Sequence, residues 1–223
     1  TITQLSTESE ATAYQRTLDI SKAVSQTTYT QDGVHYQRDY FVSAPDSVVI
    51  IRLKSDKKGA LNLRFSLSCL LPSIIRADDS HTLSSEGYAA YRAYPNDYWH
   101  QKQRFYYYPN RGIHFKTILK AVPTDGEIHG SEDGRAIEVH DCTEVMLVVS
   151  NVTSFNGAGK DPVKEGRDYR TLVERRIQAA SSQTYDQLLS THVSDYQSFF
   201  NRVSIDLGET DPILAKLPTS EQL

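Results

Sequence analysis

The stretch LNLRFSLSC, residues 61–69, alternates apolar and polar side chains at every position. Leu61, Leu63, Phe65, Leu67 and Cys69 therefore point to one face of an extended chain, and the polar residues between them point to the other. A period of two residues is typical of a strand that has one face in a core and the other in solvent. Such a strand needs a second layer over its apolar face, so this stretch favours a layered β structure.

Other segments read as strands in the same way. Asp32-Gly33 separates two β-prone runs and predicts a hairpin with a type I′ turn, because both central residues of that turn need a positive φ. Residues 48–54, VVIIRLK, form a continuous apolar run of strand length, which we expect to be buried on both faces. Further strand-like runs are found at residues 13–20, 111–122, 135–142 and 143–152.

Residues 72–110 lose this period and are interpreted as a long excursion from the sheet. About nine or ten strands joined mostly by turns, with no helical stretch between them, predict an antiparallel β-sandwich rather than βαβ units. The fold class is therefore mainly β, with a large sandwich.

The periodicity becomes helical near the C-terminus. Residues 167–181 carry apolar side chains at helical spacing, and a second helix follows Thr184. Thr184 is a good N-cap, and Gln187 three residues later completes a capping box. Residues 203–208 are interpreted as a short returning strand. We divide the chain into a β-sandwich domain, 1–155, and a helical linker with this strand and a tail, 156–223.

Composition and motifs exclude several function classes. A net charge of -4 argues against nucleic acid and anionic membrane as main partners, and no apolar run is long enough for a membrane span. The sequence GAGK at 157–160 lacks the spacing of a phosphate loop. No nucleophile motif and no set of metal ligands at the usual spacing is found, so we expect neither a metal nor a cofactor. The two cysteines, Cys69 and Cys142, are interpreted as thiols, with a single bridge as the alternative.

An aromatic cluster occupies residues 88–108, which hold nine of the 22 aromatic residues. Tyr98, Trp99 and His100 at its centre are candidates for the rim of a sugar site, since rings with polar tips stack on sugar faces. The competing interpretation is an ordered excursion that packs on the sandwich or on a neighbouring domain.

Candidate acid–base residues are few. His192 lies on the apolar face of the second helix with Asp195 near its edge, and the two are interpreted either as a catalytic pair or as residues that, with Tyr196, seat the helix on a sheet or a neighbouring domain. Asp39 and the pairs at 78–79 and 132–133 are the carboxylates available for glycosidic chemistry, and the two pairs stand in turn-like polar stretches where solvated carboxylates are ordinary.

The junction from Ser181 onward, SSQTYDQLLSTHVSDYQSFFNRVSIDLGE followed by LPTSEQL, resembles the linker of glycoside hydrolase family 95, the α-L-fucosidase family. The sandwich segments before it resemble that family as well. The matching linker residues are Tyr185, Leu188, His192, Asp195, Tyr196, Phe200, Arg202, Val203 and the run Leu217-Pro218-Thr219. The matching sandwich residues are Tyr36, Arg38, Phe41, Ser43, Pro45 and Asp46.

The resemblance implies a galactose-mutarotase-like supersandwich without its first strands, joined to a catalytic (α/α)6 barrel that would follow Leu223. In that family the barrel carries the catalytic residues, so the resemblance implies none in this chain. The parent enzyme would then hydrolyse α-L-fucosyl linkages in glycans with inversion, in the bacterial periplasm or outside the cell. The alternative is a self-sufficient carbohydrate-binding module that uses residues 88–108.

Overall fold

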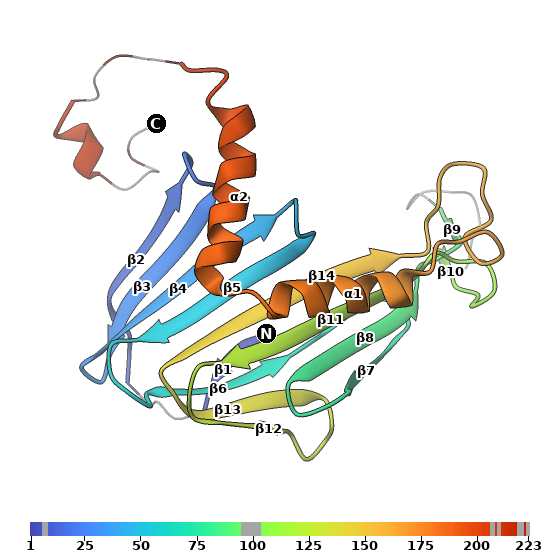
Figure 1. Ribbon diagram of the computed structural model, residues 1–223, viewed down its shortest axis with the longest axis horizontal. Helices are drawn as coiled ribbons and strands as arrows, with labels where there is room; N and C mark the ends of the chain where they lie inside the picture. Colours follow the sequence, from blue (N-terminus) through green and yellow to red (C-terminus); the bar gives the residue numbers. More distant parts are fainter. Residues whose placement is uncertain (6–8, 95–103, 206–207, 209–210, 218–220, 222–223) are drawn as a thin grey trace.

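The computed structural model describes residues 1–5, 9–94, 104–205, 208, 211–217 and 221. Within these residues the chain forms two large antiparallel sheets and two C-terminal α-helices, which confirms the mainly-β prediction (Figure 1). The larger sheet has the strand order β2 (Thr12–Asp19), β3 (Val24–Gln31), β4 (Val34–Ser43), β5 (Val48–Ser55), β14 (Glu144–Thr153), β11 (His114–Pro123), β8 (Thr82–Tyr88) and β7 (Ser73–Ala77).

The smaller sheet lies across one face of the larger one. Its strand order is β1 (Ile2–Gln4), β6 (Leu61–Ser66), β13 (Ala136–Cys142) and β12 (Glu127–Gly130). The strands β9 (Arg92–Ala93) and β10 (Phe105–Tyr106) pair with each other in a separate two-stranded sheet. The helices are α1 (Tyr169–Ser181), α2 (Tyr185–Phe200) and the short 3-10 helix η1 (Leu214–Lys216).

The predicted hairpin is confirmed. Asp32 and Gly33 have φ values of 51° and 74°, as a type I′ turn requires, and they join β3 to β4. The turn fixes the register so that Tyr29 lies opposite Tyr36, and their rings stack with centroids 5.1 Å apart. The turn chemistry of two residues thus sets the pairing of two whole strands.

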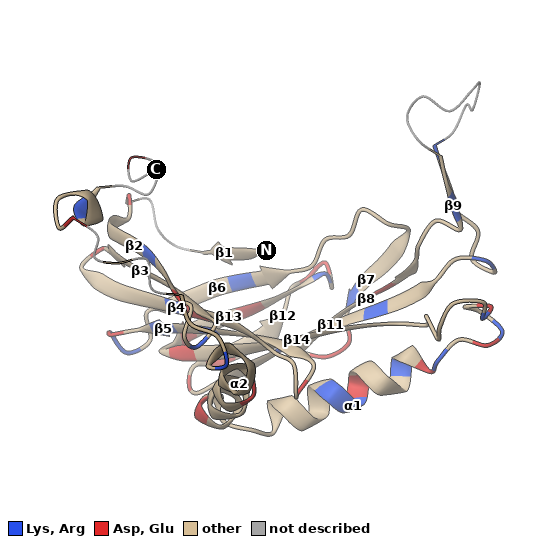
Figure 2. Cartoon of the chain, turned by 90° about the horizontal axis from the view of Figure 1, so that it is seen from above, with Lys and Arg blue, Asp and Glu red and all other residues tan. Residues whose placement is uncertain are grey.

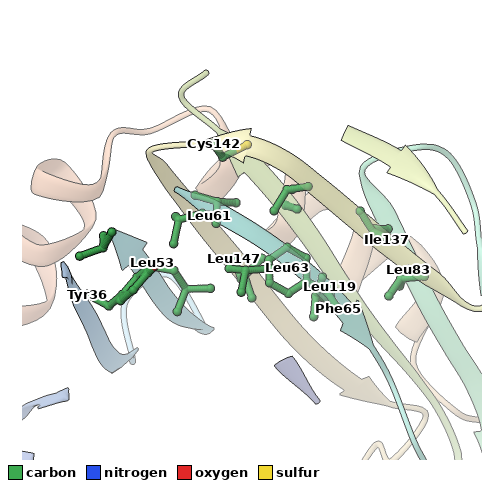
Figure 3. Close-up of a cluster of buried hydrophobic side chains, with 14 of the residues drawn as sticks. Tyr36, Leu53, Leu61, Leu63, Phe65, Leu83, Leu119, Ile137, Cys142 and Leu147 are labelled. Carbon is green, nitrogen blue, oxygen red and sulfur yellow. The ribbon is translucent and has the colours of Figure 1, made fainter. Parts of the chain in front are cut away.

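The core between the sheets is lined by the alternating strand (Figure 3). Leu61, Leu63 and Phe65 are each at most 3% exposed and face apolar residues of the larger sheet such as Leu147. The intervening Arg64 points away and pairs with Glu138 on β13. Each fully buried side chain of this size stabilises the fold by roughly 1.5–3 kcal/mol, so this layer supplies much of the driving force for folding.

The opposite face of the larger sheet is covered by the two helices (Figure 1). Val173 of α1 and Leu188 of α2 are completely buried against sheet residues that include Ile50 and Val148. The predicted capping box is present: the Thr184 hydroxyl accepts from the backbone N–H of Gln187, and the Gln187 side chain accepts from the backbone N–H of Thr184. This cap fixes where α2 begins after its turn from α1.

Three expectations differ from the structure. Residues 72–110 are not one excursion, because they contain the sheet strands β7 and β8. The sequence did not indicate β8 because its buried residues Ser84 and Ser85 are small and polar. The run at 48–54 is only partly covered on its second face, since Ile51 is half-buried. Residues 203–205, predicted to start a returning strand, are not in a strand; Val203 is 75% exposed and pairs with no sheet edge of the described chain.

Candidate functional site

An arm that carries aromatic residues projects from the body of the protein. We call residues 91–94 and 104–108 the aromatic arm. Its strand β9 stands away from both large sheets (Figure 2), and β10 pairs with β9. The backbone N–H of Tyr91 donates to Tyr106 O, and that of Tyr94 donates to Arg104 O, each at 3.0 Å. The described part of the arm is therefore a hydrogen-bonded ribbon.

Tyrosine rings contact one another edge-to-face along this ribbon. The Tyr106 ring contacts Tyr94 edge-to-face with centroids 5.8 Å apart, and it contacts Tyr91 at 6.5 Å. The guanidinium of Arg111 lies 4.4 Å from the centroid of Tyr91. At the base, a Cβ on Gly112 would clash with the carbonyl oxygen of Ala89, so only glycine allows the two sides to approach this closely. The rings and this close approach give the arm a fixed root.

A cavity of about 590 Å³ opens beside that root, and we call it the basal pocket. It is formed by β7, β8, β11 and the segment that returns from the arm. Its lining consists of Pro72, Ser73, Ile74, Arg76, Ser84, Glu86, Gly87, Tyr88, Pro109 and His114.

Glu86 is the carboxylate of the basal pocket. Its Oε1 accepts from the Tyr169 hydroxyl at 2.9 Å and from Arg170 Nε at 2.6 Å. Burial raises the pKa of Glu86, but the hydrogen bonds from Arg170 and Tyr169 outweigh burial and hold that pKa below its usual value. Burial and the bond to Glu86 raise the pKa of Tyr169 to about 12. Glu86 is therefore ionised at neutral pH and accepts hydrogen bonds rather than donating a proton.

His114 connects the basal pocket to the arm. Its Nε2 lies 2.6 Å from the carbonyl oxygen of Pro109, and its ring centroid is 5.9 Å from that of Tyr88. A carbonyl only accepts, so Nε2 carries the hydrogen and Nδ1 of the neutral ring is left as an acceptor.

The predicted rim residues, Tyr98, Trp99 and His100, lie outside the described residues. Their role in contacting sugar stays a prediction. The structure brings the flanking part of the same cluster together in the arm and places the basal pocket at its base.

The seating candidates lie on α2. His192 is 5% exposed, its Nε2 is 3.0 Å from Lys22 O, and its ring stacks on Phe41 at 4.8 Å. The Tyr196 hydroxyl donates to Ile20 O at 2.7 Å. In the described chain no hydrogen bond or ion pair joins His192 to Asp195. His192 and Tyr196 therefore hold α2 on the turn between β2 and β3, while contact with a neighbouring domain stays a prediction.

Two of the candidate carboxylates form ion pairs with neighbouring arginines. Asp39 is buried and pairs with Arg52 at 2.6 Å, and its other bonds come from Gln26 and Gln37. Asp78 pairs with Arg76.

The described residues contain no group of three or more metal-ligating side chains, and none of their helices is long and apolar enough to cross a membrane. Both cysteines are free thiols.

Sequence reasoning missed the residues that meet around the basal pocket. Glu86, His114 and Arg170 come from β8, β11 and α1, and no local motif connects them. One available signal was Glu86 itself, because alternation along β8 places it on the helix-facing side of the sheet, where a charge needs a partner.

Comparisons with known proteins place the chain among the N-terminal domains of glycoside hydrolases. Residues 1–158 match the family described as glycosyl hydrolase family 65, N-terminal domain, and the chain belongs to that family. The sequence motifs had indicated family 95, so the class was predicted correctly and the matching family is a different one. The segments behind that interpretation, a β-sandwich followed by a helical linker, do not identify one family.

Curated relatives cover most of this chain. The protein named alpha-L-fucosidase 2 of Arabidopsis thaliana is 26% identical over 88% of the chain, and a probable alpha-fucosidase A of Aspergillus niger is 26% identical over 96%. The chain spans about a quarter of the length of these relatives: 24% and 26%. A solved structure titled putative kojibiose phosphorylase, from human microbiome, matches 84% of this chain and 23% of its own with 12% identity and a TM-score of 0.44, too low to support an inference.

Proposed function

We propose that this chain is the non-catalytic N-terminal region of a glycosidase that hydrolyses α-L-fucosyl linkages in glycans with inversion. The observation that carries the proposal is the match to relatives named as fucosidases along nearly the whole chain. From the family resemblance of the sequence alone, we also propose that the parent enzyme acts in the periplasm or the extracellular space.

Seven described carboxylates have a resolved pKa shift, and none of the seven has the raised pKa of a glycosidase proton donor. A glycosidase needs a carboxylic acid with a raised pKa that protonates the leaving group, opposite a second carboxylate. Every described carboxylate with a resolved shift has its pKa lowered, which keeps it ionised: Asp19, Glu86, Asp125, Asp133, Asp161, Glu165 and Asp168. The proton donor would then come from a catalytic (α/α)6 barrel in the same parent chain.

The end of α2 offers a surface for that barrel. Apolar side chains are exposed at the end of α2 and in the segment that follows it, where Phe199 is 61% exposed, Val203 75% and Ile205 80%. Large contiguous patches of exposed apolar side chains mark interaction sites, and we propose that these three residues belong to one. In this arrangement the aromatic arm, with Tyr98, Trp99 and His100, lines the rim of the substrate site.

The test compares two proteins on an aryl α-L-fucoside. The 223-residue chain alone should show no turnover, and the full-length parent should release fucose whose anomeric configuration, followed by NMR, is inverted. Turnover by the isolated chain would disprove its non-catalytic role. A full-length parent that leaves the fucoside intact, or retains its configuration, would disprove the assigned activity.

The alternative function is a self-sufficient carbohydrate-binding module. It is favoured by exposed rings on the arm, where Phe105 is 41% and Tyr108 52% exposed. Binding of free fucosylated glycans by the isolated chain, lost on Trp99→Ala and kept on Phe155→Ala, would support it. Equal binding by both variants would exclude the arm as the glycan platform.

A further inference from the structure

We propose that the basal pocket binds one neutral sugar residue and does so without a catalytic domain. This site differs from the arm and its rim residues, and the proposed function assigns no ligand to it. The inference rests on the size of the pocket, the chemistry of its walls and those polar atoms of its lining residues that have no partner in the described chain.

The size fits a small ligand. Sites for small molecules have volumes of about 300–1,000 Å³ and combine apolar walls with a few convergent polar groups. The basal pocket, at about 590 Å³, is in this range. Pro72, Ile74, Tyr88 and Pro109 provide the apolar part of its walls, and the Tyr88 ring provides a surface on which the C–H face of a sugar stacks.

The polar groups supply acceptors. Glu86 receives its hydrogen bonds from Tyr169 and Arg170 at Oε1, and its Oε2 accepts none from the described residues. The two donors hold the carboxylate in place before a ligand arrives. His114 Nδ1 is a second acceptor, because Nε2 is engaged with Pro109. A sugar hydroxyl donates to such groups without bringing a charge into the pocket.

A donor faces the same space. Arg76 uses Nε to bind Asp78 at 2.8 Å, and its two terminal nitrogens have no hydrogen-bond partner within the described ranges. Sugar hydroxyls both donate and accept, so a set that contains acceptors and a donor suits them. Glu86 pairs with Arg170 and Arg76 pairs with Asp78, so each charge in the lining is balanced by a neighbouring residue. The lining therefore favours a neutral polyhydroxylated ligand over a phosphate.

The experiment uses the complete chain and free sugars. L-fucose and D-glucose are titrated into the protein and followed by saturation-transfer and chemical-shift NMR, with inorganic phosphate and a short neutral peptide as competing probes. The decisive variant is Ile74→Trp, because Ile74 lines the pocket and is 72% exposed, so a larger side chain fills the cavity without disturbing the core. The matched control is Leu70→Trp, fully exposed and outside the lining.

We expect at least one sugar to bind, with affinity reduced about tenfold or more by Ile74→Trp and unchanged within about twofold by Leu70→Trp. Glu86→Gln, which replaces one acceptor oxygen by a donor, should weaken binding in the same direction. No sugar binding, binding that survives Ile74→Trp, or preference for phosphate or the peptide would each overturn the inference. None of these results depends on the fucosidase assay, so the two proposals fail separately.

Discussion

Replacing Asp39 by Asn tests whether one buried ion pair holds the helical layer on the sheet. Asp39 Oδ2 accepts from Arg52 Nε at 2.9 Å and from Arg52 Nη2 at 2.6 Å, and the side chain of Asp39 is only 3% exposed. The guanidinium of Arg52 also lies 3.7 Å from the ring centroid of Tyr185, the first residue of α2. One carboxylate therefore orients a cation that contacts a strand and a helix.

The expected cost follows from this geometry. An Asn side chain keeps one acceptor oxygen but turns an NH2 group toward donors of Arg52 or Gln37, so the ion pair is lost and Arg52 stays without its counter-charge. Removing one partner of a buried pair costs about 3–5 kcal/mol. Arg52 keeps 20% side-chain exposure, which lets water replace part of the loss, so we expect about 2–4 kcal/mol. At this chain length, each kcal/mol lowers Tm by about 2–4 °C.

Urea denaturation followed by circular dichroism measures the effect. The matched control is Glu144→Gln, which breaks the more exposed pair with Lys54 between β14 and β5, 3.8 Å long, and should cost less than about 1 kcal/mol. If Asp39→Asn unfolds within about 0.5 kcal/mol of the control, the buried pair does not hold the helical layer and our reasoning about it is wrong.

Three further predictions concern other parts of the chain. Gly126→Ala should lower the unfolding free energy, measured by urea denaturation, by more than about 2 kcal/mol, because φ is 76° and a Cβ would lie 2.7 Å from Asp141 O. Gly134→Ala, where φ is 64° and the space is open, should lower it by about 1 kcal/mol. Equal losses would show that crowding at Gly126 does not matter. Burial raises the pKa of Cys142 to about 11, so at about pH 8 a thiol reagent should modify only Cys69 in the folded chain and both cysteines after denaturation; rapid modification of two thiols in the folded chain would contradict this. The pKa of Glu86 is lower in the folded chain than its value near 4.5 in the unfolded chain, so ionised Glu86 stabilises the fold at pH values above 4.5, and this stabilisation is lost as the pH falls through the folded pKa. The variant Glu86→Gln should therefore lose less unfolding free energy than the wild type between about pH 6 and pH 3. Equal losses in the two proteins would refute this prediction.

Local chemistry made much of the sandwich predictable. The alternation at 61–69, the Asp32-Gly33 turn and the capping box at Thr184 each depend on neighbours in the sequence. The structure contains the turn and the capping box, and it forms the alternating strand over residues 61–66, three residues shorter than predicted. The strand β8 was missed because Ser84 and Ser85 carry no apolar period, although packing buries them. Burial of a small polar side chain depends on what lies above it, which the sequence alone does not show.

The candidate site was predictable only in part. Composition located the aromatic cluster, and the structure adds that its described residues form a projecting ribbon. The pairing of Glu86 with Tyr169 and Arg170 joins positions more than 80 residues apart, so it depends on how the sheet and α1 pack. The prediction of a returning strand was wrong for a related reason. A strand needs a sheet edge to pair with, and the apolar residues at 203–205 do not show whether an edge lies beside them.

The strand order of the larger sheet separates strand pairings that are local in sequence from one that joins distant parts of the chain. From β2 to β5 the strands pair with their neighbours in sequence through short turns, so this meander closes only small loops. Its link to the other half is the pairing of β5 with β14, beside which Ser55 bonds Thr143 across 88 residues. Closing so long a loop costs entropy before any contact repays it, so we expect the meander to form first and to leave the β5 edge unpaired until β14 has been synthesised. During synthesis that edge is the place where two chains would pair with each other, and the interval before β14 emerges sets how long each chain is exposed to that risk.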